Sequence, residues 1–110
     1  PCYSEAHVLK DPALLHKFSG LRNSLPQRQY ALLCSALLAT IIGGHIMYAT
    51  CSINKNENEE IIKKLIKKKG DHVEVVPLQS PLGENTPWGV SVLPHQHQAG
   101  PAFFSLLRKL

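Results

Sequence analysis

A glycine pair, Gly43-Gly44, separates two apolar stretches of different character, and this feature constrains the fold most strongly. Before the pair, residues 27–39 carry apolar side chains at spacings of three and four, which is typical of a helix that follows Pro26. After it, residues 45–50 are large or β-branched, as in a short buried strand. This order predicts a layered α/β fold. Because the helix is apolar around much of its girth, we expect it to pack between other elements.

A second helix is marked by its ends. We expect Asn56 to cap it, Glu59 to complete a capping box and Gly70 to stop it. Its predicted core stripe consists of Ile61, Ile62, Leu65 and Ile66. The remaining prediction is of strands over residues 73–76, 88–93 and 102–107, and of a mostly irregular segment over residues 3–26 with one short helix at 13–18.

Length and composition exclude several classes of protein. The chain has 110 residues, the size of one small domain. A hydrophobic fraction of 44% with a formal charge of +4 argues against disorder, and this charge is compatible with a polyanionic partner without requiring one. The longest stretch of mostly apolar residues, 36–42 with Thr40 among them, is far shorter than the roughly 20 residues of a membrane span, so we expect no membrane association.

Three cysteines, Cys2, Cys34 and Cys51, form neither a zinc spacing nor a disulfide framework, which favours a reducing cytoplasm. Cys51 directly follows a predicted strand, and substrates of open α/β sheets bind beyond the carboxyl ends of strands. A thiolate there can act as a nucleophile, although most such cysteines are small buried hydrophobes. Cys34 lies in the apolar helix, where we expect a packing role.

Two further groups have alternative interpretations. His95 and His97 would point the same way on a strand, but no third ligand stands at a metal spacing, so we expect no metal site. Five lysines gather in the second helix: Lys63, Lys64, Lys67, Lys68 and Lys69. They are either a solvated face that complements the helix dipole or a phosphate-binding patch.

Several motifs together resemble a known family, the Sun/Fmu-type RNA cytosine-5 methyltransferases. The string Tyr48-Ala49-Thr50-Cys51-Ser52-Ile53 is followed at the family's spacing by Glu57-Asn58-Glu59 and preceded by Gly43-Gly44. Pro1-Cys2 resembles the end of the family's Asp-Ala-Pro-Cys motif, and Gly100, Phe103-Phe104 and Arg108-Lys109 resemble its final strand. The resemblance spans the whole chain.

The resemblance implies a two-cysteine mechanism that uses S-adenosylmethionine (SAM). Cys51 would add as a thiolate to C6 of a target cytosine, because covalent addition divides one difficult step into easier ones. Cys2 would help to release the product. Pro1 would present its backbone to the cytosine edge, and residues 57–59 would support the loop that carries Cys51.

The sequence also departs from the family pattern. Tyr3-Ser4-Glu5 follows Cys2 where the family commonly has Ser-Gly-Thr-Gly, which is closer to a shorter branch that includes mitochondrial-type enzymes. The substrate is therefore left open between tRNA and rRNA. The family's SAM-binding loop and acidic residues would stand before Pro1, and Gly43-Gly44 precedes a strand, so it cannot serve as that loop.

We therefore expect residues 1–110 to form a partial methyltransferase catalytic domain, the C-terminal half of a Rossmann-like class I sheet, ending in an antiparallel strand. The expected partners are RNA and the N-terminal half of the same domain. We expect the isolated chain to be inactive, and also to be poorly stable or oligomeric because one sheet edge is exposed. The alternatives are a truncated, non-catalytic module that binds RNA through residues 63–69 or a partner through its edge, and a metal-binding protein that uses His95, His97 and a cysteine.

Overall fold

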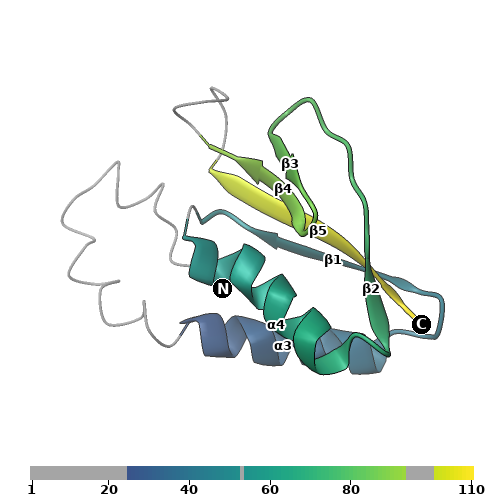
Figure 1. The fold of residues 1–110 in the computed structure, drawn as a ribbon. Helices are drawn as coiled ribbons and strands as arrows, with labels where there is room; N and C mark the ends of the chain where they lie inside the picture. The colour runs from purple at the N-terminus through teal and green to yellow at the C-terminus, as the bar shows by residue number, and fades with distance from the viewer. Residues whose placement is uncertain (1–24, 53, 94–100) are drawn as a thin grey trace.

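The computed structural model describes residues 25–52, 54–93 and 101–110, in which two helices cover one face of a five-stranded sheet (Figure 1). The helices are α3 (Leu25–Ala39) and α4 (Glu59–Lys69), with a short 3₁₀ helix, η1 (Lys55–Glu57), before α4. The strands are β1 (His45–Thr50), β2 (Val73–Val76), β3 (Glu84–Thr86), β4 (Gly89–Val92) and β5 (Ala102–Lys109). The α/β prediction is confirmed.

Strand β5 is the centre of the sheet. It pairs along one side with β1, from His45 opposite Arg108 to Thr50 opposite Phe103. Its other side pairs with β4 near its start and with β2 near its end, and β3 pairs with β4. Every pair among these strands is antiparallel, so the predicted antiparallel terminal strand is confirmed.

Most element boundaries agree with the sequence patterns. Strands β1 and β2 have the predicted bounds, α3 begins two residues early, and β5 extends to Lys109. Strand β3 was not predicted, because Glu84–Thr86 is a three-residue polar segment whose strand conformation depends on pairing with β4. The short helix expected at residues 13–18 lies outside the described residues.

Two expectations about burial were wrong. Strand β1 is not buried on both faces: Ile46 and Tyr48 face the core, whereas the side chain of Met47 is 56% exposed. Helix α3 was expected to pack between elements, but Leu32 and Leu38 are 52% and 82% exposed. An apolar pattern identifies side chains that can be buried, but the neighbouring elements decide which of them are.

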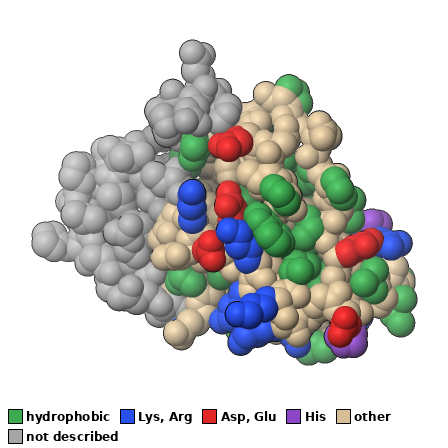
Figure 2. Space-filling model, viewed as in Figure 1, with side chains coloured by type: hydrophobic (Ala, Val, Ile, Leu, Met, Phe, Trp, Pro, Cys, Tyr) green, Lys and Arg blue, Asp and Glu red, His purple; other side chains and the backbone are tan. Residues whose placement is uncertain are grey.

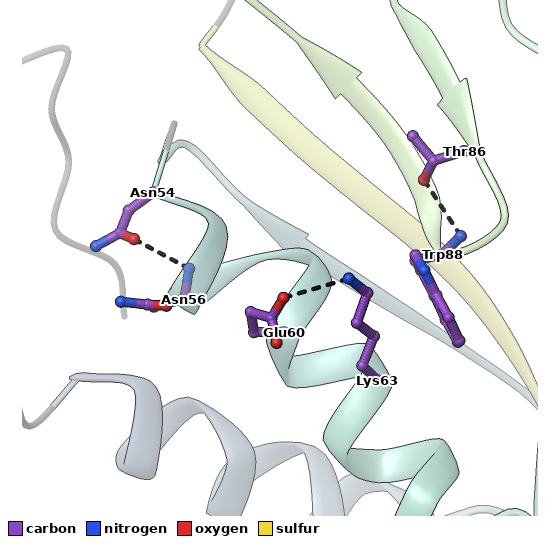
Figure 3. Close-up of polar contacts among 6 residues, drawn as sticks. All are labelled: Asn54, Asn56, Glu60, Lys63, Thr86 and Trp88. Atoms are coloured by element: carbon purple, nitrogen blue, oxygen red, sulfur yellow. Dashed lines mark hydrogen bonds and ion pairs between the residues drawn. The ribbon is translucent and has the colours of Figure 1, made fainter.

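The start of α4 also differs from the prediction. The side chain of Asn54 accepts a hydrogen bond from the Asn56 backbone N–H at 3.0 Å, so it caps η1 (Figure 3). Helix α4 itself begins at Glu59, and Asn58 precedes it without a side-chain capping bond. The predicted capping box between Asn56 and Glu59 is therefore wrong. Gly70 ends the helix as expected.

The core lies between the helices and the sheet. Ile61, Ile62 and Leu65 of α4 are buried, as predicted, and Ile66 is partly buried against them. The other buried members of this cluster are Leu33, Leu37, Ile46, Tyr48, Val73, Phe103 and Leu107. In the part of the chain that the structure describes, no helix is long and apolar enough to cross a membrane.

Candidate active site

Cys51 stands at the carboxyl end of β1, as the sequence predicted, and its side chain is exposed to solvent. The alternative interpretation, a small buried hydrophobe, is therefore wrong for this residue. Cys34 is partly buried and packs against the core, which agrees with its expected packing role. A thiol at the end of a strand is accessible to a substrate, and its position depends on the backbone on both sides of it.

The residue after Cys51 is held by several hydrogen bonds. Ser52 is 1% exposed, and its hydroxyl donates to Oε2 of Glu57 at 2.9 Å. The backbone N–H of Asn54 donates to the same hydroxyl at 3.0 Å, and Nδ2 of Asn58 donates to the Ser52 carbonyl at 2.7 Å. The main chain that carries Cys51 is thus fixed from its C-terminal side.

Glu57 is the centre of this arrangement. It is fully buried, and a buried carboxylate is tolerated only when hydrogen bonds replace its water. Its Oε1 accepts from Nε2 of Gln29 on α3 at 3.0 Å, in addition to the Ser52 bond on Oε2. Its backbone carbonyl accepts from the Tyr48 hydroxyl at 2.6 Å. Contacts from α3 and β1 therefore determine where the loop before α4 lies.

Asn58 ties the other end of the loop to β1. Its Oδ1 accepts from the Thr50 hydroxyl, while its Nδ2 is used on the Ser52 carbonyl. The Thr50 hydroxyl oxygen also accepts from the Ser52 backbone N–H at 3.3 Å. The two neighbours of Cys51 in sequence, Thr50 and Ser52, are thus both bonded to Asn58. This arrangement agrees with the supporting role that the resemblance implied for residues 57–59.

A pocket of about 130 Å³ adjoins this loop. Ser52, Asn58 and Glu59 line it on one side, and Glu84 and Ser91 of the β3–β4 hairpin line it on the other. Among the described residues, the lining includes Ser52, which follows Cys51 in the sequence, but not Cys51 itself.

Several predicted site residues lie outside the described residues. These are Cys2 and Pro1, expected at the active site, and His95 and His97, considered as metal ligands. Within residues 25–52, 54–93 and 101–110, no group of three or more His, Cys, Asp or Glu side chains could hold a metal ion.

The glycine pair Gly43-Gly44 lies in a turn between a helix and a strand. Gly43 has φ +84° and joins α3 to β1, a helix-to-strand turn in which its N–H donates to the Lys109 carbonyl at 2.7 Å. A Cβ on Gly44 would lie 2.6 Å from Cγ2 of Thr40, so packing within the turn requires this glycine. Gly43-Gly44 therefore forms a helix-to-strand turn, and it is not the strand-to-helix loop on which a SAM site would depend.

Several lysines of α4 make contacts within the protein. Lys63 forms an ion pair with Glu60 at 3.3 Å, and its Nζ lies 5.9 Å from the Trp88 ring centroid (Figure 3). Nζ of Lys64 and of Lys68 lie 4.3 Å and 5.8 Å from the Tyr30 ring centroid. Basic side chains gather on the lower part of the face shown in Figure 2.

Gln29 is the site residue that sequence reasoning missed. It occupies the buried stripe of α3 together with Leu25, Leu33 and Leu37. The sequence does contain a signal, since Gln29 is a polar residue at an apolar position of the helical pattern. A buried amide at such a position needs a hydrogen-bonding partner. The sequence alone did not indicate that this partner would be Glu57.

Comparison with known proteins decides the family. Residues 1–108 match the family described as 16S rRNA methyltransferase RsmB/F. The chain belongs to this family. The ribosomal RNA small subunit methyltransferase F of Salmonella agona (strain SL483) is 35% identical over 116 residues, which cover 100% of this chain and 24% of the relative. The chain thus spans about a quarter of the length of the curated relatives that it matches.

Solved structures confirm the fold of this RsmB/F family member. The crystal structure of PH0851 matches with a TM-score of 0.82 and 34% identity, over 99% of this chain and 25% of that one. A methyltransferase homologue from Pyrococcus horikoshii matches with a TM-score of 0.67 and 28% identity, over 80% of this chain and 32% of that one. The predicted Sun/Fmu resemblance and the methyltransferase-like fold are thereby confirmed.

Proposed function

We propose that the protein containing this chain methylates C5 of a cytosine in RNA, with Cys51 as the nucleophile. The observation that carries the proposal is the exposed thiol of Cys51 at the end of β1, next to a loop that buried hydrogen bonds hold in place. Membership of the RsmB/F family supports RNA methylation as the reaction. The names of its curated relatives favour ribosomal RNA over tRNA as the substrate.

The proposed chemistry begins with the Cys51 thiolate. Its sulfur forms a bond to C6 of the cytosine, which moves electron density to C5 and makes that carbon nucleophilic. After C5 has been methylated, the C5 proton leaves to a base and the bond between sulfur and C6 breaks. We assign assistance of this last stage to Cys2, and contact with the cytosine edge to the Pro1 backbone. SAM would supply the methyl group from a cofactor-binding half outside these residues.

The hydrogen bonds around Ser52 support this role of Cys51. Attack on C6 requires that the sulfur be held close to the carbon and in the correct direction, and small displacements cost rate steeply. Ser52 and Asn58 restrict the backbone next to Cys51 while leaving its side chain exposed. The site therefore combines an accessible nucleophile with a rigid support.

Covalent trapping tests the proposal. In the full-length enzyme, by which we mean these residues joined to the cofactor-binding half, Cys51→Ser should abolish methyl transfer. Cys2→Ser should accumulate a protein–RNA complex that survives denaturing electrophoresis, because release is blocked after the bond to C6 has formed. Cys34→Ser is the matched control, and it should retain turnover without a covalent complex. Retained turnover in both Cys51→Ser and Cys2→Ser contradicts the proposal.

The second candidate is a non-catalytic module that binds RNA through α4. Lys67 and Lys68 are exposed, and among the residues of the described ranges neither takes part in an ion pair, so their charge is available to phosphates. RNA binding with a steep salt dependence, together with no covalent complex in Cys2→Ser, would favour this candidate over the enzyme.

A further inference from the structure

Gln29 occupies an unusual place in α3. The buried stripe of this helix consists of three leucines and Gln29, whose side chain is only 2% exposed. Burying a primary amide is unfavourable unless hydrogen bonds compensate for the lost water. A fourth leucine would satisfy the packing of the helix without this cost, so the amide indicates a requirement other than core packing.

The partner of the amide is the buried carboxylate behind the Cys51 loop. Nε2 of Gln29 donates to Oε1 of Glu57 at 3.0 Å, across 28 residues of sequence. The other carboxylate oxygen, Oε2, accepts from the hydroxyl of Ser52 at 2.9 Å. Each carboxylate oxygen therefore has a donor that fixes its direction, one on a helix of the core and one next to Cys51.

This geometry connects α3 to Cys51 through side chains that are almost completely buried. Gln29, Glu57 and Ser52 are 2%, 0% and 1% exposed. Water competes little for these bonds, and their electrostatic strength is greater than at the surface. A change in the orientation of the Glu57 carboxylate would alter its hydrogen bond to Ser52 and would move the main chain beside Cys51.

We propose that Gln29 is a positioning residue for Cys51: through Glu57 and Ser52 it holds the thiol in the direction required for attack. The inference rests on the proposed function, in which Cys51 is the nucleophile. Gln29 itself does not touch the substrate in this proposal. Its loss should slow the step that Cys51 performs and leave binding of RNA nearly unchanged.

The first experiment separates positioning from stability in the full-length enzyme. Gln29→Met keeps the length and apolar packing of the side chain and removes the donor to Glu57. We expect kcat to fall by about 10- to 100-fold, the range that misplacement of a reacting group produces, with KM for RNA changed by less than about twofold. Leu37→Met, on the same buried stripe, is the matched control and should keep kcat.

A second control accounts for loss of stability. Leu37→Ala should lower Tm at least as much as Gln29→Met, because it leaves a cavity in the core, yet it should retain kcat in the folded enzyme. Equal falls of kcat in Gln29→Met and Leu37→Ala would overturn the inference and assign Gln29 a structural role only.

Exchanging the amide of Gln29 and the carboxylate of Glu57 tests whether the lost kcat can be restored. Gln29→Glu alone places two carboxylates against each other, which is unfavourable in a buried site, and kcat should fall strongly. Adding Glu57→Gln restores one amide and one carboxylate, so the double variant should recover most of the lost kcat. Absence of recovery, or wild-type kcat in Gln29→Met, overturns the role of Gln29. Turnover that survives Cys51→Ser instead refutes the proposed function, so the two failures are distinguishable.

Discussion

The hydroxyl of Ser52 donates a hydrogen bond to the carboxylate of Glu57 across 2.9 Å, and both side chains are shielded from solvent. Glu57 lies five residues after Ser52, so this bond closes the loop between β1 and α4 on itself. The exposed Cys51 is thereby attached to a loop whose support is inside the protein. Cys51 is exposed, so its thiol is accessible, whereas the next residue, Ser52, is buried and fixes the main chain.

Removing the carboxylate should destabilise the fold. Glu57→Leu leaves the donors of Gln29 and Ser52 buried without their acceptor, which should lower the free energy of unfolding by about 2 to 4 kcal/mol. Urea unfolding of the full-length enzyme measures this change. Glu60→Gln, at an exposed position of α4, is the control and should stay within about 0.5 kcal/mol of wild type. A similar effect of the two substitutions would contradict the proposed importance of the buried bonds.

Two glycines with positive φ should differ in their sensitivity to alanine. At Gly89, with φ +154°, an added Cβ would lie 2.5 Å from the Phe104 carbonyl oxygen and 2.9 Å from Cζ of Phe103. At Gly43, with φ +84°, a Cβ would meet nothing within 4 Å. We expect Gly89→Ala to cost about 3 kcal/mol or more and Gly43→Ala about 1 to 2 kcal/mol, by urea unfolding. The reverse order would refute the prediction.

Stability should decrease at alkaline pH because of Tyr30. Burial raises the pKa of its hydroxyl above the ordinary value of 10.0. Above that value the unfolded chain loses the phenolic proton while the folded chain keeps it, so the folded state binds more protons and stability falls as pH rises. Urea unfolding of wild type and Tyr30→Phe, measured from below to above pH 10.0, checks this. Parallel pH profiles of the two proteins would exclude the effect.

The α4 lysines provide a test of RNA affinity. Replacing Lys67 and Lys68 by Gln should weaken RNA binding and reduce the slope of log K against log salt by about one for each phosphate that the variant no longer neutralises. Filter binding over a salt series measures the slope. Lys63→Gln is the matched control, since Lys63 is already paired with Glu60 and should contribute less. An unchanged slope in the double variant would indicate that Lys67 and Lys68 contact solvent and not RNA.

Among the strands that the structure describes, β1 pairs with β5 alone, and this edge should make the isolated 110-residue chain self-associate. Met47 is 56% exposed, and it lines a pocket of about 220 Å³ between α3 and β1 together with Leu32. Met47→Lys should reduce association, because a charged side chain on an edge strand opposes pairing. Sedimentation velocity should show oligomers for the wild-type chain and more monomer for the variant. A monodisperse wild-type monomer would contradict this expectation.

Local patterns of composition and period predicted most of the elements. The run of large and β-branched residues at 45–50 indicated β1, although not which of its faces is buried, and the apolar stripe of α4 indicated its buried face because periodicity reports which side chains share a face. The start of α4 could not be predicted in the same way. Asn54, Asn56 and Asn58 are all suitable capping residues, and the side chain of Asn58 bonds to Thr50 and Ser52 instead of capping the helix.

The sequence by itself determined the α/β order, the place of Cys51 after a strand and, through its motifs, the methyltransferase family. Only the tertiary structure decided that Gln29 meets Glu57, that one face of α3 is exposed and that β5 is the central strand. The physical reason is range. Motifs and periodicity act over a few residues, whereas the Gln29–Glu57 bond joins positions 28 residues apart and exists only once α3 has packed against the loop that carries Cys51.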